Sequence, residues 1–416
     1  MMKMFTRKSA SDITREDVEL LATRFRAGSR QGDVARLIRT KGVQDMTKIM
    51  DLLEAHDVPV NRFDVVSPDA ASTAKSRSSR AQVVLPKPPK GAAHYMFSLP
   101  VDFRPAMVLH RFEDVYLSFD VTRDARREFY LFDSKKRLIN GMFFGAQPFL
   151  DPEMGTVEAP SVLIDDLFVK PNICHFLYDK MPRVAVAAPE FGPREALLFQ
   201  DFTYAREVLG ILDIPMTALA AKAKRGTVRL KDVVVYANSF NKPGHPGMMG
   251  GPAHVAALDT LRQRIYDLAG PAGPDAPRRY MLDRAPGLPR NITNRDEVVK
   301  LLEARNVTLG DPATLSTREQ LMLFAHVDLL IGVHGAGLTN LSYQPRGARV
   351  IELLPPLCAT RAYWIMAGAQ GQRYDAITCH DPELGVVDAA GLKHDGSQNR
   401  RDVVVPIDQL DAALAE

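Results

Sequence analysis

The segment from Asp328 to Asn340 combines residue types that suit an anion-binding turn. An apolar stretch runs into His334 and then into Gly335–Gly337, and a short helix is predicted to begin near Leu338. Glycines let backbone N–H groups approach a bound group, and the start of a helix favours negative charge, so the turn suits a phosphate or pyrophosphate. The alternative is a tight strand-to-helix turn that binds nothing, because glycine often serves only the backbone.

The glycine spacing and several missing motifs narrow the class of chemistry. The order is GxxGxG, from Gly332 to Gly337, and neither the GxGxxG of dinucleotide-binding folds nor the GxxxxGK[ST] of P-loops is present. The chain has no GxSxG and no HExxH, which argues against the common hydrolase designs. It also has no D-x-D pair of aspartates to clamp a nucleotide-bound divalent metal, so we expect chemistry that needs no metal.

A second candidate is the pair His175 and Asp179 within residues 172–183. In an α-helix, residues four apart share a face, so one side chain could take a proton while the other orients it or binds the substrate. The alternative is an ordinary ion pair on a helix surface, which the same spacing also predicts.

Further polar residues lie at the ends of predicted strands or within them. Arg284, Arg290 and Asn294 follow a predicted strand at 280–282, and α/β folds gather ligand-binding groups at such strand ends. Arginine there can bind phosphate with two hydrogen bonds, although a solvated loop is the alternative for each residue. Glu352 lies in an apolar predicted strand, where an unpaired charge is costly, so we expect a structural cation or a ligand hydroxyl such as that of a ribose beside it.

The elements that position these residues follow from the periodicity of the chain. Residues 14–57 show helical spacing of apolar side chains, a Ser-, Arg- and Pro-rich stretch follows, and short apolar runs typical of strands start at about 93. After about 160, strand-like runs alternate with helical patterns, which is typical of α/β units. We therefore predict four parts: a helical appendage at 1–66, a linker at 67–92, an N-terminal lobe at 93–230 and a C-terminal lobe at 231–416.

Within the C-terminal lobe, individual elements can be predicted. We expect its first strand at Val233–Tyr236 and a helix from about 254 to 268. Capped helices are expected after Asn294 and Ser316, because each is followed three residues later by Glu, as in a capping box.

The composition is that of a soluble globular protein. The chain has 416 residues, 46% of them hydrophobic and 25% charged, which excludes wholesale disorder and allows two or three domains. Three cysteines are too few for a disulfide framework, and we see no signal peptide or spanning segment, so we expect a cytoplasmic protein. The first 100 residues hold 17 Lys and Arg against 11 Asp and Glu, which permits a peripheral contact at the inner membrane face, whereas no nucleic-acid-binding signature is present.

Three segments, in order, resemble glycosyltransferase family 61. NICHFLYDKMPRV at 172–184 is similar to the family's NYFHWLFDVLPRL-like segment, and DLLIGVHGAGLTNLSYQPRGARVIELLPP at 328–356 is similar to its DVIVGPHGAGLTNLLFMPPGSxVIEL-like segment. Residues 280–328 between them resemble the family's linking pattern of an arginine after a strand, an Asn-x-x-Glu helix start and an Asp-Pro. The resemblance covers about 160–360.

The resemblance implies a fold and a reaction. The implied fold is GT-B, in which two Rossmann-like lobes face a cleft, and the implied reaction is inverting, metal-independent transfer of a sugar from a nucleotide diphosphate sugar, with a UDP-sugar favoured. The base that takes the proton of the acceptor hydroxyl falls on Asp179, with His175 as the second candidate. The candidate donor-binding residues are His334, Gly335, Ala336, Gly337, Leu338, Thr339, Asn340, Arg284, Arg290 and Glu352.

The resemblance also suggests a product and leaves two alternatives. Backbone N–H groups and an arginine would stabilise the departing pyrophosphate, and the acceptor would belong to a bacterial cell-surface polysaccharide or lipopolysaccharide. One alternative is a nucleotide-sugar-binding pseudoenzyme on the same fold. The other is a different nucleotide-dependent α/β enzyme, such as an epimerase or dehydrogenase, which predicts a GxGxxG that the chain lacks.

Overall fold

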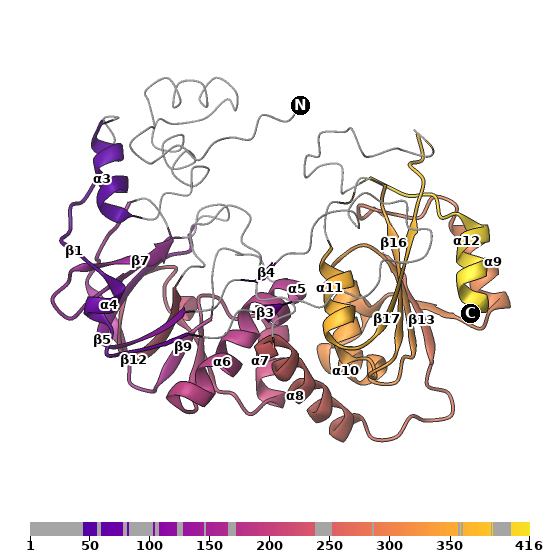
Figure 1. The fold of residues 1–416 in the computed structure, drawn as a ribbon, viewed down its shortest axis with the longest axis horizontal. Coiled ribbons are helices and arrows are strands. Elements are labelled where there is room, and N and C mark those ends of the chain that lie inside the picture. The colour runs from indigo at the N-terminus through magenta and orange to yellow at the C-terminus, as the bar shows by residue number, and fades with distance from the viewer. Residues whose placement is uncertain are drawn as a thin grey trace.

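The structure is a computed structural model in which two β-sheets have helices packed between them (Figure 1). No helix in the described part of the chain is long and apolar enough to cross a membrane. Apart from a few side chains, the described residues are 45–55, 60–77, 81–82, 103–104, 108–122, 128–144, 147–164, 172–237, 252–284, 287–356, 358, 361–383, 385 and 401–416.

The first sheet is mixed and has ten strands among these residues. Its order is β1-β7-β6-β5-β12-β9-β10-β11, with β2 beside β5 and β8 beside β12. The long strands β5 (Val108–Asp120) and β12 (Arg225–Ala237) are antiparallel, and β9, β10 and β11 continue parallel to β12. The other strands are β1 (Val65–Val66), β2 (Ala74–Arg77), β6 (Glu128–Phe132), β7 (Leu138–Phe144), β8 (Glu153–Val157), β9 (Ser161–Leu163), β10 (Glu195–Leu198) and β11 (Met216–Ala218), and a separate pair is β3 (Ala81–Gln82) with β4 (Phe103–Arg104).

This sheet corrects the expected division of the chain. The strand expected at Val233–Tyr236 is the second half of β12, so the boundary expected at residue 230 falls inside a strand of the first sheet. β1 and β2 pair with β7 and β5, so they belong to this sheet rather than to an appendage and a linker. Periodicity indicates a strand but not its partners, and here the partners are far away in sequence. The antiparallel β5–β7 half also differs from the Rossmann-like sheet that was expected.

The expected helical appendage is described only in its last part. α3 (Met46–Ala55) buries Met46, Ile49, Met50 and Leu53 against residues of β6 and β7, so it covers the first sheet. Residues 1–44 and 56–59 of the expected appendage lie outside the described residues.

The second sheet is entirely parallel, in the order β14-β13-β15-β16-β17. In chain order this is 2-1-3-4-5, the order of a doubly wound sheet, with the switch point between β13 and β15. All residues of β15 and β16 are buried, as expected for parallel strands covered on both faces. The strands are β13 (Arg279–Leu282), β14 (Thr308–Gly310), β15 (Leu329–Val333), β16 (Arg349–Leu354) and β17 (Arg373–Thr378).

Helices cover both faces of the second sheet (Figure 1). α9 (Arg295–Ala304) and α12 (Ile407–Ala415) pack on the outer face, and α8 (Pro252–Ala269), α10 (Thr317–Phe324) and α11 (Ala362–Ala369) lie on the inner face. The capping box of Ser316 and Glu319 is confirmed. Asn294 instead bonds the backbone of Val405 with its side chain, so the box expected there is absent.

One apolar cluster joins the two sheets. It contains Leu198 and Tyr236 from the first sheet, Leu282 and Leu330 from the second, and buried side chains of the helices between them. The helices on the side of the first sheet are α5 (Ile173–His175), α6 (Met181–Phe191) and α7 (Thr203–Ile211); short helical turns also occur at α4 (Pro68–Ala71), Leu219–Ala221 and Pro312–Thr314. Because the apolar cluster is continuous, residues that follow strands of either sheet have fixed places relative to one another.

Candidate functional site

The switch point of the second sheet lies between the carboxyl ends of β13 and β15. The chain after β13 leads to α9 on the outer face, whereas the chain after β15 forms a 3₁₀-helix, Ala336–Tyr343, on the inner face. Doubly wound sheets bind their ligands in the crevice that such a divergence opens. The residues that follow the two strands are Arg284 and Arg290 on one side and His334 and Gly335 on the other, so the structure brings these predicted residues together.

The guanidinium group of Arg284 lies directly against Gly335. A Cβ atom on Gly335 would overlap Nη2 of Arg284 and would come within 3.6 Å of the Arg290 guanidinium carbon. Nη1 of Arg284 donates to the carbonyl oxygen of Pro289 at 2.8 Å, and Nη1 of Arg290 donates to that of His334 at 2.6 Å. Glycine at 335 therefore allows Arg284 to reach the backbone of the turn, whereas Arg290 would make only an ordinary contact with a Cβ atom there.

The two arginines place like charges close together. Burial, and then the neighbouring charge of Arg290, lower the pKa of Arg284. Arg284 has no ion pair among the described residues, and Arg290 has a φ of +70°, a conformation that non-glycine residues rarely adopt and that occurs often at functional sites. A bound anion would relieve the repulsion between the guanidinium groups.

A cavity of about 220 Å³ opens beside the arginines. Its polar lining includes the ion pair of Arg295 with Asp283, whose N and O atoms are 2.6 Å apart. Its volume is below the range of roughly 300–1,000 Å³ of drug-sized pockets, so it would hold part of a nucleotide. The lining residues are Met281, Leu282, Asp283, Arg284, Gly287, Arg290, Asn291, Ile292, Arg295, Val298, Val299, Leu309 and Val333.

The glycine turn is buried at Gly335 and partly open at the two residues that follow. Ala336 and Gly337 are partly exposed, and the first N–H groups of a helix have no acceptor within it. Leu338, Thr339 and Asn340 are buried and do not line the cavity; the Asn340 amide donates to the carbonyl of Gly337 at 2.9 Å. The structure therefore places Leu338, Thr339 and Asn340, which were predicted to bind the donor, in the core.

Glu352 meets its expected cation within the protein. One carboxylate oxygen lies 2.5 Å from Nδ1 of His334, and the other accepts a 2.5 Å hydrogen bond from the hydroxyl of Tyr374. Burial disfavours a charged His334, but the Glu352 carboxylate and, after it, Cys358 together outweigh burial and raise the pKa of His334 to about 9. His334 thus turns its ring toward Glu352, and neither side chain lines the cavity.

The segment 172–183 does not form the continuous α-helix that the His175 and Asp179 spacing assumed. Asn172 caps α5 by accepting from the N–H groups of Cys174 and His175, and a π-helix, Phe176–Lys180, then leads into α6. Pro182 explains the change, because it lacks an N–H group and its ring clashes with the carbonyl four residues earlier. π-Helical turns are frequent at functional sites.

The wider turn alters the relation between the two predicted catalytic residues. His175 ends α5 and is partly exposed, whereas Asp179 lies in the π-helix, so four residues no longer correspond to one α-helical turn. The side chain of Asp179 lies outside the described residues.

The two motif-bearing segments contact each other. The hydroxyl of Tyr178 in the π-helix is hydrogen-bonded to that of Ser342 in the 3₁₀-helix, and Tyr204 of α7 is hydrogen-bonded to Tyr343. All four side chains are buried or nearly so. The structure therefore holds the segment with His175 and Asp179 against the segment with the glycine turn.

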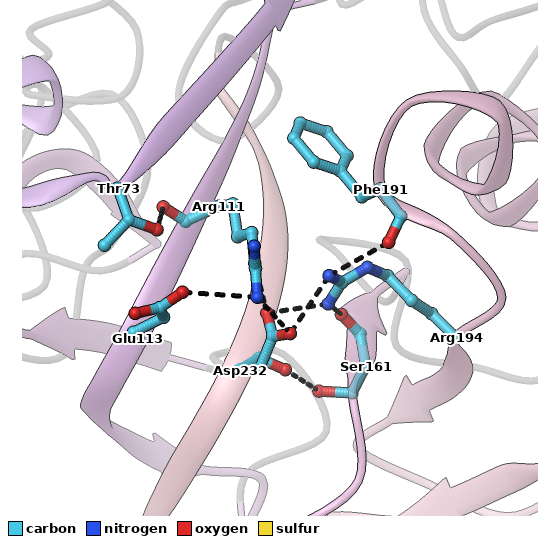
Figure 2. A network of polar contacts seen from close by, with 7 residues as sticks. All are labelled: Thr73, Arg111, Glu113, Ser161, Phe191, Arg194 and Asp232. Carbon is cyan, nitrogen blue, oxygen red and sulfur yellow. Dashed lines mark hydrogen bonds and ion pairs between the residues drawn. The ribbon is translucent and has the colours of Figure 1, made fainter.

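A polar network that the sequence did not indicate lies elsewhere in the first sheet. Figure 2 shows the Asp232 carboxylate between Arg111 and Arg194, with nitrogen–oxygen distances of 2.9 and 2.8 Å. Arg194 precedes β10, and the Ser161 hydroxyl at the start of β9 donates to the backbone carbonyl of Asp232. Because ligands gather at carboxyl ends of parallel strands and this network lies at amino ends, we interpret it as structural.

The segment that contains the π-helix and the glycine turn matches a known protein family. Residues 173–351 match the family model described as Glycosyltransferase 61. This region is similar to the glycosyltransferase 61 family. The family region contains the π-helix, both arginines and the glycine turn, so the resemblance noted in the sequence is confirmed there.

Similar proteins include a named transferase. The EGF domain-specific O-linked N-acetylglucosamine transferase of Drosophila melanogaster is 36% identical over 91 residues, which are 20% of this chain and 17% of that relative. The chain thus spans less than a fifth of this glycosyltransferase 61 relative.

Two solved structures are distantly similar. They are the iron-containing dodecameric glycosyltransferase TibC of enterotoxigenic E. coli and the TibC heptosyltransferase in complex with ADP-D-beta-D-heptose, at 13% and 11% identity and TM-scores of 0.27 and 0.30. The first comparison covers 60% of this chain and 75% of TibC, and the second 74% and 90%. Likeness of this degree supports no inference about this chain.

Proposed function

We propose that this protein is an inverting glycosyltransferase that moves a sugar from a nucleotide diphosphate sugar to a hydroxyl group. The family region supports the reaction class. A uridine nucleotide is the proposed carrier, and the proposed acceptor is a bacterial cell-surface polysaccharide or lipopolysaccharide reached at the inner membrane face. The proposed architecture is a variant of GT-B, with the second sheet as the nucleotide-binding lobe and the mixed first sheet in place of a second Rossmann-like lobe.

The single observation that carries the proposal is the pair of arginines against Gly335 at the switch point. Two guanidinium groups and the first N–H groups of a helix converge where a doubly wound sheet binds ligands. A diphosphate provides the negative charge that this arrangement favours. The cavity beside Asp283 and Asn291 would then receive the ribose or the base.

The proposed reaction uses one base and one anion site. Asp179 takes the proton of the acceptor hydroxyl, and the oxygen attacks the anomeric carbon while the bond from that carbon to the diphosphate oxygen breaks. The nucleotide diphosphate leaves with both bonding electrons, and Arg284, Arg290 and the N–H groups at Gly335–Gly337 stabilise its charge. Attack from the face opposite the leaving group inverts the anomeric centre. These groups would serve in place of a metal ion.

Transfer from radiolabelled donors tests the proposal. The purified protein is incubated with UDP-, GDP- and ADP-linked sugars and glycan acceptors in EDTA, starting with UDP-N-acetylglucosamine because the Drosophila relative is named for that sugar. The proposal predicts acceptor-dependent release of one nucleotide diphosphate and an inverted product anomer. Nucleotide binding without turnover would indicate a pseudoenzyme, and turnover that requires NAD would indicate a different nucleotide-dependent enzyme.

A further inference from the structure

Glu352 is placed where it can act on the site without touching the ligand. Its side chain is 1% exposed, and its two oxygens are occupied by His334 and Tyr374. It does not line the cavity beside Arg284. A direct hydrogen bond from a ribose hydroxyl to Glu352 is therefore incompatible with this arrangement.

His334 is fixed at three points where β15 ends. Its N–H group donates to the carbonyl of Leu353 at 3.0 Å, its carbonyl accepts from Arg290, and its Nδ1 bonds Glu352. Its ring packs beside that of Tyr363, with centroids 5.2 Å apart, and the Tyr363 hydroxyl donates to the carbonyl of Gly335 at 2.6 Å. The ring and backbone of His334 thus set the start of the glycine turn.

We propose that Glu352 is a positioning residue that holds His334 as an imidazolium beneath the Gly335–Gly337 turn. The inference rests on the proposed function, because the charge would act on the diphosphate of the donor. Within the buried pair, His334 adjoins the turn and Glu352 lies on the next strand, so the positive end of the pair faces the ligand. Because charges in a buried environment are poorly screened, the orientation of the pair affects the electrostatic energy of a bound diphosphate.

Several titratable or charged groups surround His334 and could affect its titration. They are Glu352 from β16, Tyr374 from β17, Tyr363 from α11, Cys358 after β16, and Arg284 and Arg290 from the loop after β13. Burial raises the pKa of Tyr363 and of Tyr374 far above the usual range, so both remain neutral. A Cys358→Ala variant controls for the thiol.

Nuclear magnetic resonance of ¹³C-labelled histidine tests the proposal directly, with His334→Gln used to assign the signal. We expect His334 to titrate near pH 9 in the wild type and at a lower pH in Cys358→Ala, because the sulfur also raises this pKa. In Glu352→Gln we expect the largest fall, to a proton affinity about 100-fold weaker than that of the wild type, because the opposing charge is gone. An unchanged titration in Glu352→Gln would overturn the proposal. This result does not depend on ligand binding, so it is distinct from failure of the proposed function.

UDP binding provides the second test and does not require Glu352→Gln to fold. The affinity of the wild type is compared with that of His334→Gln from pH 7 to pH 10, which cancels the titration of UDP itself. We expect the wild-type advantage, about fivefold for one nearby charge, to disappear with a midpoint near pH 9. A ratio independent of pH would overturn the role of the charge, whereas absence of UDP binding in both proteins would overturn the donor assignment.

Discussion

Arg290 donates a 2.6 Å hydrogen bond from Nη1 to the carbonyl oxygen of His334. The bond joins the loop after β13 to the end of β15, the two strands that flank the switch point of the second sheet. It therefore closes one side of the crevice in which Arg284 lies against Gly335.

Loss of Arg284 is expected to weaken nucleotide binding. Replacing it by Ala removes a partly buried guanidinium from the proposed diphosphate site, which should raise the Kd for UDP about 10- to 100-fold, the cost of a hydrogen bond to a charged group. Isothermal titration calorimetry measures the change. Arg278→Ala is the matched control, because Arg278 pairs with Asp328 at the exposed amino end of β13 and should leave the Kd unaltered. Equal effects of the two variants would contradict the assignment.

Gly335→Ala should impair the site through shape rather than charge. The added methyl group would overlap the Arg284 guanidinium, so that side chain must move away from the turn. We expect weaker UDP binding with a melting temperature near that of the wild type. Gly210→Ala in α7 is the control, since its methyl group meets open space and alanine favours a helix by about 0.5–1 kcal/mol. Undiminished UDP affinity in Gly335→Ala would show that the close approach of Arg284 to Gly335 does not contribute to UDP binding.

The stability of the protein should fall at alkaline pH. His334 has a pKa of about 9 in the folded state, above the unfolded value of about 6.5, so its contribution is complete below about pH 6.5 and is lost as the pH rises toward 9. The upper limit of that contribution is about 3 kcal/mol, at 1.36 kcal/mol per pKa unit. Urea unfolding between pH 6 and 9.5 measures it. In His334→Gln, the free energy of unfolding should change less with pH over this range. An equally steep dependence on pH in that variant would mean that other groups cause it.

Asp232→Ala should destabilise the fold but not change the chemistry. It leaves Arg194, whose side chain is 2% exposed, without the carboxylate that it bonds, and breaking a buried pair costs about 3–5 kcal/mol. Chemical denaturation provides the free energy of unfolding. The exposed pair of Asp328 with Arg278 serves as control, since Asp328→Ala should cost less than about 1 kcal/mol. Loss of UDP affinity in folded Asp232→Ala would show that the network is more than structural.

Asp179→Asn tests the proposed base. We expect transfer to fall about 10²- to 10⁴-fold, the usual contribution of a general base, with the Kd for UDP unchanged. His175→Asn, measured beside it, distinguishes the second candidate. Turnover like that of the wild type in Asp179→Asn, with a large loss in His175→Asn, would move the role of base to His175.

The sequence predicts the local elements of the site well. The apolar strand before His334, the strand at 280–282, the capping box at Ser316 and the need of Glu352 for a partner all follow from residue type and short spacing. The identity of that partner does not, because it depends on sheet register. β16 lies parallel to β15 with Glu352 opposite Gly332, which puts the carboxylate beside His334, two residues further along.

Contacts between distant segments account for the features that could not be predicted. Val233–Tyr236 has the pattern of a strand, but only pairing with β5 and β9 assigns it to the first sheet. Asp232 and Arg111 are 121 residues apart, so no spacing rule connects them. The π-helix arises from Pro182 within an otherwise helical pattern, and the pattern alone favours an α-helix.

A thermal-shift comparison of nucleotides tests whether the switch point of the second sheet binds a diphosphate. UDP, GDP, CMP, NAD and ATP are added in EDTA to the wild type, to Arg284→Ala and to Arg278→Ala, and a ligand that binds the folded state raises the melting temperature. We expect UDP to stabilise the wild type and Arg278→Ala and to stabilise Arg284→Ala much less. Stabilisation by NAD in place of UDP, or equal stabilisation of all three proteins by UDP, would contradict a diphosphate site at the switch point.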